Sequence, residues 1–327
     1  MKTTMTLVAA GLVATAMSMP VHAQTQTVTT PEGAQMDVPA DLAYKPGALT
    51  QEQLMSSTRS LFRQNSMNVF RRFPPDKTAE MVKFYTQALA LRSLNPIQLT
   101  SSQQMLLTGV GSGQIKLSAG QQGTRKYIND GYKAATGLRI LTLTYPDAAT
   151  VTKRFTDAGF AAPKFTDQGD GTKAAIVTDP GGFSIEIVVR PGAKDHSDDG
   201  VGVGVSVSNL EKSRAFYREF VGLDELPPVK DKAMGVTKYP YRHQETTIYL
   251  YKLDGTLQAD TGSAGIQYVI SDAPMADAKG KARKIAVETP LNKLRGFDLT
   301  TVWLNDPDGV TNYYAQVAAR RTTAAAN

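Results

Sequence analysis

The residues with the clearest potential for chemistry are a glutamate and two polar side chains far from it in sequence. Glu186 lies in the segment 183–187, where strand alternation puts two isoleucines on one face and the carboxylate on the other. A partly buried carboxylate has a raised pKa and can act as a general base. Asn68 and Arg72 share a face of an earlier expected strand and could stabilise an oxyanion. A salt bridge from Glu186 to Arg72 or Arg139, or a surface position for Arg72, is the structural alternative.

Aromatic residues are frequent after residue 238 and favour a ligand-binding wall. Tyr249 and Tyr251 are two positions apart on an expected strand, so their rings share one face. Such a face can hold an apolar or aromatic ligand, although aromatic residues are also ordinary strand formers. His243 is either an acid–base residue or a surface side chain. The candidate ligand contacts are Arg139, Tyr239, Tyr241, Tyr249, Tyr251, Trp303 and Tyr313.

The composition limits the available chemistry. The 327 residues include no cysteine and three histidines, and the net charge is +6 at pH 7. Disulfides, thiolate metal sites and a cysteine nucleophile are therefore excluded. The densest basic cluster, 279–284, is typical of a solvated helix face, with a phosphate or anionic-glycan patch as the alternative. We expect no nucleic-acid partner.

The N-terminus is typical of an exported protein. Lys2 precedes the short apolar run Met5–Met19, and Val21-His-Ala23 is a small-residue cleavage signal. Residues 1–23 are therefore expected to be a signal peptide. The run is too short for a membrane anchor, and no later stretch predicts a membrane span. The expected location is the periplasm or the exterior of the cell.

The next segment leads into the folded part of the chain. Residues 24–49 are rich in Thr, Gln, Pro and Ala without apolar periodicity, so we expect a flexible leader. Thr50 and Gln53 then form the pattern of a capping box. This pattern predicts an N-terminal helix over residues 50–65.

One pattern recurs along the remaining chain. Residues 203–217 indicate a strand with alternating valines, an Asn turn and a helix carrying a Phe-Tyr pair, and 67–85 repeats this order. The two copies close on Asp-Pro-x-Gly phrases at Asp179 and Asp306. Weaker strand–helix starts within each copy raise the total to four βαβββ units. The expected divisions are a first domain over 66–191, a linker over 192–199, a second domain over 200–318 and a disordered tail over 319–327.

This arrangement resembles the vicinal oxygen chelate superfamily, which includes glyoxalase I, bleomycin-resistance proteins and extradiol dioxygenases. The resemblance rests on residues 203–217 and on the closures at Asp179 and Asp306, and it covers about 66–318. It implies an α+β fold in which four βαβββ units form two vicinal-oxygen-chelate-like domains. In that superfamily, paired units curl into a cup around a small-molecule cavity.

The resemblance also implies a divalent metal held by His or Gln on the first and fifth strands and by Glu on the last strand. Such a site leaves open positions for two substrate oxygens. The corresponding residues are Asn68, Leu138 or Arg139, and Glu186 in the first domain, and Gly202, Gly265 or Gln267, and Tyr313 in the second. Because a standard His/Glu centre cannot be assembled from them, we expect no metal and no other cofactor.

These observations predict an exported protein that acts on a small organic molecule, with aromatic compounds among the candidates. In the first hypothesis it is a metal-independent isomerase or lyase in which Glu186 abstracts a proton, while Asn68 and Arg72 stabilise the oxyanion. The alternative is a non-catalytic binding or sequestering protein of the bleomycin-resistance type. A third hypothesis is a purely structural role, with the cavities filled by side chains. A homodimer is compatible with the sequence.

Overall fold

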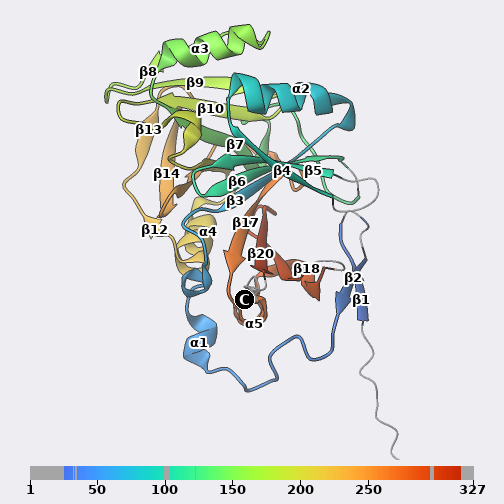
Figure 1. The fold of residues 1–327 in the computed structure, drawn as a ribbon. Coiled ribbons are helices and arrows are strands. Elements are labelled where there is room, and N and C mark those ends of the chain that lie inside the picture. The colour runs from blue at the N-terminus through green and yellow to red at the C-terminus, as the bar shows by residue number, and fades with distance from the viewer. Residues whose placement is uncertain are drawn as a thin grey trace, which may run out of the picture.

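The computed structural model describes residues 26–31, 33, 35–98, 104–121, 123–294 and 298–317 (Figure 1). The expected signal peptide (1–23) and tail (319–327) lie outside these ranges. The first unit contains β3 (Asn68–Phe73), α2 (Thr78–Lys83) with a π-helical turn (Phe84–Ala88), β4 (Arg92–Gln98), β5 (Gln104–Val110) and β6 (Gly113–Ala119). The second contains β7 (Ala135–Tyr145), α3 (Ala148–Asp157), β8 (Thr166–Asp167), β9 (Lys173–Thr178) and β10 (Ser184–Val189).

The third and fourth units repeat this order. The third contains β11 (Gly202–Ser206), α4 (Leu210–Ala215) with a π-helical turn (Phe216–Val221), β12 (Asp224–Glu225), β13 (Val229–Asp231), β14 (Val236–His243) and β15 (Thr246–Tyr251). After β16 (Gln258–Ala259), the fourth contains β17 (Ala264–Ile270), α5 (Ala273–Ala282), β18 (Ala286–Lys293), β19 (Leu299–Asn305) and β20 (Thr311–Val317). The α+β class with four such units is confirmed.

Each sheet combines units that are distant in sequence. Within the described ranges, the first sheet has the order β1-β2-β18-β19-β20-β17-β3-β6-β5-β4 and joins the first unit to the fourth. The second has the order β12-β14-β15-β11-β7-β10-β9-β8, with β13 on β14 and β16 on β7, and joins the second unit to the third. At the two junctions, β3 lies antiparallel to β17 and β7 lies antiparallel to β11.

This pairing corrects the expected grouping of the units. The boundaries 66–191 and 200–318 put the first and second units together, whereas their strands lie in different sheets. The expected linker, 192–199, connects the second and third units, which share a sheet. Strand alternation defines which face of a strand is buried, but it does not identify the distant strand that completes the ladder.

Each Phe-Tyr pair forms a hydrogen bond with one of the two Asp-Pro-x-Gly turns. Tyr85, from the first Phe-Tyr pair, donates its hydroxyl to Asp179 at 3.1 Å, and Tyr217, from the second pair, donates to Asp306 at 2.9 Å. The side chain of each aspartate also accepts from the backbone of its own turn. The helix of one unit is thereby tied to the closing turn of the next, although the two units belong to different sheets.

Tyr217→Phe is expected to lower the free energy of unfolding by about 1.5–3 kcal/mol, the usual contribution of a hydrogen bond to a charged group. Asp306 is buried, and burial raises its pKa to about 7, so loss of a donor leaves its carboxylate less stabilised. Urea denaturation measures the effect. Tyr44→Phe is the matched control because Tyr44 makes a similar bond to Asp272 on the exposed surface. Equal losses in both variants would contradict the assignment.

The main hydrophobic core lies between the sheets and the helices that cover them. It takes residues from all four units. The π-helical turn after α2 packs on α3, where Phe84 meets Phe155 edge to face at a centroid distance of 5.6 Å. In Figure 1, α2 and α3 accordingly lie along the same side of the molecule.

The N-terminal segment differs from expectation. β1 (Gln26–Thr29) and β2 (Gln35–Val38) form a hairpin that extends the first sheet beside β18, so the prediction of a flexible leader over 24–49 is wrong for these strands. The capping box at Thr50 is confirmed, but α1 ends at Met55 because Ser56 is extended. A 3-10 turn, Arg59–Leu61, follows. In the described part of the chain, no helix is long and apolar enough to cross a membrane.

Candidate functional site

The first sheet has a polar face opposite its core face. Alternation along its central strands sends Val69, Ile115 and Ile266 into the main core, so their neighbours point the other way. Four polar residues on this opposite face, one from each of β3, β6, β17 and β20, are called the Lys116 face: Asn68, Lys116, Gln267 and Tyr313. The strand order β20-β17-β3-β6 brings residues from the first and fourth units together.

A chain of hydrogen bonds orients the amides of the Lys116 face. The backbone N–H of Gln114 donates to Asn68 Oδ1 at 3.0 Å, so the Asn68 nitrogen must point elsewhere. This nitrogen donates to Gln267 Oε1 at 2.9 Å, and Lys116 Nζ donates to the same oxygen at 2.6 Å. Lys116 therefore rests on a neutral amide oxygen whose orientation is fixed by its neighbours.

The Lys116 ammonium has an unusual environment. Burial lowers its pKa from 10.5 to about 8, and no acidic group among the described residues contributes to the shift. The residue as a whole is nevertheless only half-buried. An ammonium has three N–H donors. Gln267 accepts one of them, and no other acceptor for Lys116 occurs in the described part of the chain, which leaves two for a ligand.

Arg72 adds a second cation to the same side of the first sheet. It stands four residues after Asn68 on β3, and its guanidinium donates to the Gly262 carbonyl at 3.2 Å and lies 4.6 Å from the centre of the Phe70 ring. Burial lowers its pKa, although Tyr127 and Glu288 act in the opposite direction.

Arg125 and aromatic side chains lie at the fourth-unit end of this face. Arg125 donates through Nε to Glu288 at 2.8 Å, and its guanidinium is 5.3 Å from the centre of the Trp303 ring. Trp303 contacts Tyr313 edge to face at 5.0 Å. Burial raises the pKa of the Tyr313 phenol, with hydrogen bonds to Thr301 and Gln267 opposing the shift. The phenol is thus neutral at physiological pH.

A surface cavity of about 470 Å³ lies in a different part of the structure from Lys116 but includes Tyr127 in its lining. It is formed by the two connections that precede β7 and β17, and its lining residues are Tyr127, Ile128, Asn129, Asp130, Ala134, Thr256, Leu257 and Gln258. Tyr127 also interacts electrostatically with Arg72 and Arg125. One residue of the cavity lining is therefore close enough to Arg72 and Arg125 to affect their charges.

The second sheet also has a polar face, but its charges are paired and buried. Glu186 accepts from Thr142 Oγ1 at 2.5 Å and from Lys238 Nζ at 2.6 Å. Lys238 also bridges to Asp231 at 2.5 Å and lies 5.0 Å from the centre of the Tyr249 ring. Only 1% of Glu186 is exposed. The predicted strand position of Glu186 is therefore right, but its partner is Lys238 instead of Arg72 or Arg139.

Proton sharing explains the charge balance of this cluster. Burial raises the pKa of Glu186 to about 7, the Lys238 ammonium lowers it, and a hydrogen bond with Asp231 raises it again. Burial alone would raise the pKa of Asp231, but hydrogen bonding to Glu186 and the Lys238 charge together lower it to about 2. Burial likewise opposes the charge of Lys238, whose pKa is raised by the two acids. Glu186 and Asp231 thus titrate as a pair, with burial favouring a proton shared between them and the Lys238 ammonium favouring ionisation.

The predicted catalytic residues do not form one site. Glu186 lies on β10 in the second sheet, whereas Asn68 and Arg72 lie on β3 in the first. A small apolar cluster of Ile140, Met234 and Tyr251 also packs on the Glu186 face. The pairing of the first unit with the fourth separates Asn68 from Glu186, which sequence order had placed in one domain.

The predicted aromatic wall is divided as well. Tyr249 and Tyr251 share the Glu186 face, as expected from their spacing. Tyr239 and Tyr241 pack instead with the main core on the opposite side of the second sheet. The remaining two members, Trp303 and Tyr313, belong to the first sheet.

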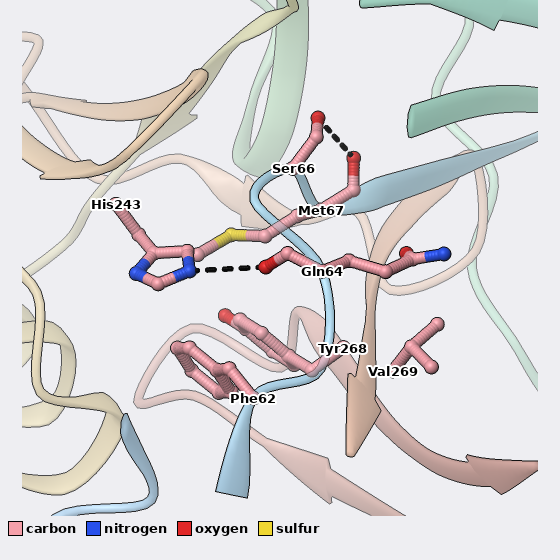
Figure 2. A pocket seen from close by; sticks show the side chains of 7 residues that line it. All are labelled: Phe62, Gln64, Ser66, Met67, His243, Tyr268 and Val269. Atoms are coloured by element: carbon pink, nitrogen blue, oxygen red, sulfur yellow. Dashed lines mark hydrogen bonds between the residues drawn. The ribbon is translucent and has the colours of Figure 1, made fainter. Parts of the chain in front are cut away.

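His243 lies beside a cavity large enough for about one water molecule, about 10 Å³ (Figure 2). Its Nε2 contacts the Gln64 carbonyl oxygen at 3.1 Å, and its ring meets Phe62 edge to face at 4.9 Å. Its Nδ1 is buried and has no hydrogen-bond partner among the described residues. Burial lowers the pKa of the imidazole, so His243 is neutral at physiological pH. The side chain joins the N-terminal segment to β14, away from the Lys116 face.

Arg139 holds the two connections in place. It is fully buried, forms an ion pair with Asp260, and donates to the carbonyl oxygens of Ile128 and Gly131 at 2.6 Å each. Asp260 in turn accepts the backbone N–H groups of the loop before β17. Arg139 was predicted to contact a ligand, but its guanidinium bonds to other residues of the protein instead.

The architecture matches that of solved structures along most of the chain. Glyoxalase I from Zea mays superposes with a TM-score of 0.60 at 19% identity, covering 77% of this chain and 92% of that one. The fold is that of glyoxalase I. A proposed dioxygenase from Bacillus subtilis gives a TM-score of 0.57 at 15% identity, covering 81% of this chain and 87% of that one. No protein-family model and no curated protein matches the sequence.

In this glyoxalase I fold, the residues at the expected metal positions do not fit a divalent cation. On the first sheet, the Lys116 ammonium binds the oxygen that Gln267 would offer to a metal. On the second, Lys238 binds Glu186, and a Cβ on Gly202 would meet the Tyr249 ring at 2.6 Å. No group of three or more His, Cys, Asp or Glu side chains suited to a metal occurs in the described ranges.

Sequence reasoning missed both of these lysines. Lys116 and Lys238 occupy alternating positions in ordinary strand patterns, so each resembles a solvent-facing residue. A usable signal existed for Lys116, because it stands in β6 at the position that Glu186 takes in β10, on the closing strand of its unit.

Proposed function

We propose that this protein binds a small organic anion on the Lys116 face, which favours the binding alternative over proton abstraction by Glu186. The observation that carries the proposal is the Lys116 ammonium, which rests on a neutral amide oxygen and has no acidic partner in the described ranges. The contrast with Lys238, which is held by the acidic side chains of Glu186 and Asp231, supports it.

The surroundings of Lys116 favour a carboxylate attached to an apolar body. Lys116, Arg72 and Arg125 bring three positive charges to this side of the sheet, and Glu288 pairs with Arg125. Phe70, Trp303 and Tyr313 supply aromatic surface for the rest of the ligand. The predicted export would place this site outside the cytoplasm.

A second candidate function is metal-independent lyase or isomerase chemistry with Lys116 in place of Glu186 as the base. The lowered pKa of Lys116, about 8, favours it because an amine with a pKa near the working pH can accept a proton. Turnover of a bound anion that is lost in Lys116→Arg would support this candidate over simple binding.

Lys116→Met is expected to weaken the binding of benzoate, a simple aromatic carboxylate, by about 10–100-fold, the equivalent of one charged hydrogen bond. Isothermal titration calorimetry at pH 7 measures the change. Wild-type affinity should also fall as the pH rises above about 8, because Lys116 is protonated below its pKa and neutral above it.

Lys153→Met is the control, since Lys153 is a largely exposed residue of α3 that pairs with Asp157 of its own helix. It should leave benzoate binding unchanged. Equal affinity of the wild type and Lys116→Met, or no change in affinity across pH 8, would contradict the proposal.

A further inference from the structure

We propose that Lys116 captures the carbonyl group of a small 2-oxo acid as a covalent imine, with the nearby guanidinium groups attracting the carboxylate of the same molecule. This inference rests on the proposed anion site and names its ligand class. It also gives the protein a chemical activity that the anion site alone does not require.

The geometry of the Lys116 face suits an amine that reacts. Among the described residues, the Lys116 amine donates to Gln267 Oε1, a neutral acceptor that can bind either the ammonium or the neutral amine. The Asn68 amide, fixed by the Gln114 backbone, holds this oxygen in place. Burial without an acidic partner also keeps the pKa near 8, so roughly one lysine in ten is neutral at pH 7.

Lys238 provides the internal contrast. It too is a lysine on a polar sheet face, but Glu186 and Asp231 hold it as a buried ammonium and raise its pKa. A protonated amine has no lone pair with which to attack a carbonyl carbon. The two lysines therefore differ in whether a neutral amine is available, which imine formation requires.

The positive charges explain the choice of a 2-oxo acid over a neutral carbonyl compound. Arg72 lies on β3 two residues beyond Phe70, the residue opposite Lys116 in the ladder. Arg125 adds a further charge near the Trp303 ring. Electrostatic attraction by these groups concentrates anions near Lys116. A carboxylate next to the carbonyl carbon lets one small molecule use both interactions.

The reaction is balanced without any additional reagent. The neutral Lys116 nitrogen forms a bond to the carbonyl carbon, and the carbonyl π electrons move to oxygen, which takes a proton to give a carbinolamine. The nitrogen lone pair then forms the C=N bond as the hydroxyl group leaves with a proton as water. One water molecule is released for each imine, and no electrons are gained or lost.

Reductive trapping tests the proposal on the full chain. The protein is incubated at pH 7.5 with glyoxylate, the smallest 2-oxo acid, and with cyanoborohydride, then digested with trypsin and analysed by mass spectrometry. Unmodified protein yields the peptides 93–116 and 117–125, whereas an alkylated Lys116 blocks cleavage and yields 93–125 with the added mass. We expect the adduct at Lys116 to exceed that at Lys153 or Lys238 by about tenfold or more.

Two comparisons make the outcome decisive. Acetaldehyde, which lacks a carboxylate, should label Lys116 less than glyoxylate does; equal labelling would overturn the assignment to a 2-oxo acid. Lys116→Arg keeps the positive charge but cannot form this imine, so it should lose the adduct while losing less benzoate affinity than Lys116→Met. Labelling spread evenly over the surface lysines would overturn the imine proposal but not the anion site. If the wild-type protein does not bind benzoate, the anion site itself is overturned.

Discussion

Lys238→Met is expected to lower the free energy of unfolding by about 3–5 kcal/mol at pH 8, because it removes the cation from a buried pair of acids. Glu186 and Asp231 are 1% and 7% exposed, and both contact the Lys238 ammonium, at 2.6 and 2.5 Å. Without that charge, the ionised carboxylates have no nearby cation to offset their burial. Urea denaturation of wild type and variant gives the difference directly.

The pH dependence of this loss follows from the state of Glu186. Its folded pKa, about 7, is already above the ordinary value of 4.5, and removing Lys238 raises it further. A group whose pKa is raised on folding contributes stability at pH values below its unfolded pKa and loses it as the pH rises through the folded value. The deficit of the variant should therefore be smaller at pH 5 than at pH 8.

The double variant Lys238→Met/Glu186→Gln separates charge from packing. It removes one acid together with the cation, so it should recover part of the stability that Lys238→Met loses. Lys153→Met, at an exposed position, should change stability by less than about 0.5 kcal/mol. A deficit that is the same at both pH values and in the double variant would show that the lysine chain matters for packing alone.

Arg139→Met is expected to cost about 3–5 kcal/mol of unfolding free energy, because it leaves the buried Asp260 without its cation. It also leaves the Ile128 and Gly131 carbonyl oxygens without their guanidinium donor. The connections that precede β7 and β17 converge on this ion pair. Thermal and urea denaturation should therefore show a large loss of stability, with no specific effect on ligand affinity in the folded fraction.

A double-mutant cycle with Asp260→Asn checks the assignment. Because the two side chains interact directly, the combined loss should be smaller than the sum of the single losses by about 1–3 kcal/mol. Additive losses would contradict direct pairing. If Arg139→Met keeps normal stability but binds benzoate more weakly, Arg139 is a ligand contact, as the sequence suggested.

The local structure was predictable because its signals are local. Alternating valines and isoleucines, an N-capping turn and the Phe-Tyr pair identify each βαβββ unit from a short stretch of sequence, and four such units lead to the α+β fold. The same alternation correctly placed Glu186 on the face opposite Ile185 and Ile187. It also placed Tyr249 and Tyr251 together.

The partners of those residues depend on the tertiary structure. Glu186 and Lys238 are 52 positions apart, and Lys116 and Gln267 are 151 apart. Each pair meets only because the second unit adds to the third and the first adds to the fourth. Sequence order suggested the opposite grouping, and it joined Glu186 to Asn68 in a site that does not exist.

The sequence by itself therefore determined the repeated unit and the buried face of each strand, and it showed which residues stand at the expected metal positions. Its strand periodicity and its shortage of histidines are enough for these conclusions. The tertiary structure decided which lysine is neutralised and which remains available, since the pKa and reactivity of a lysine depend on the charges that distant strands place around it. Lys238 meets two carboxylates and Lys116 meets an amide, a difference that no local pattern contains.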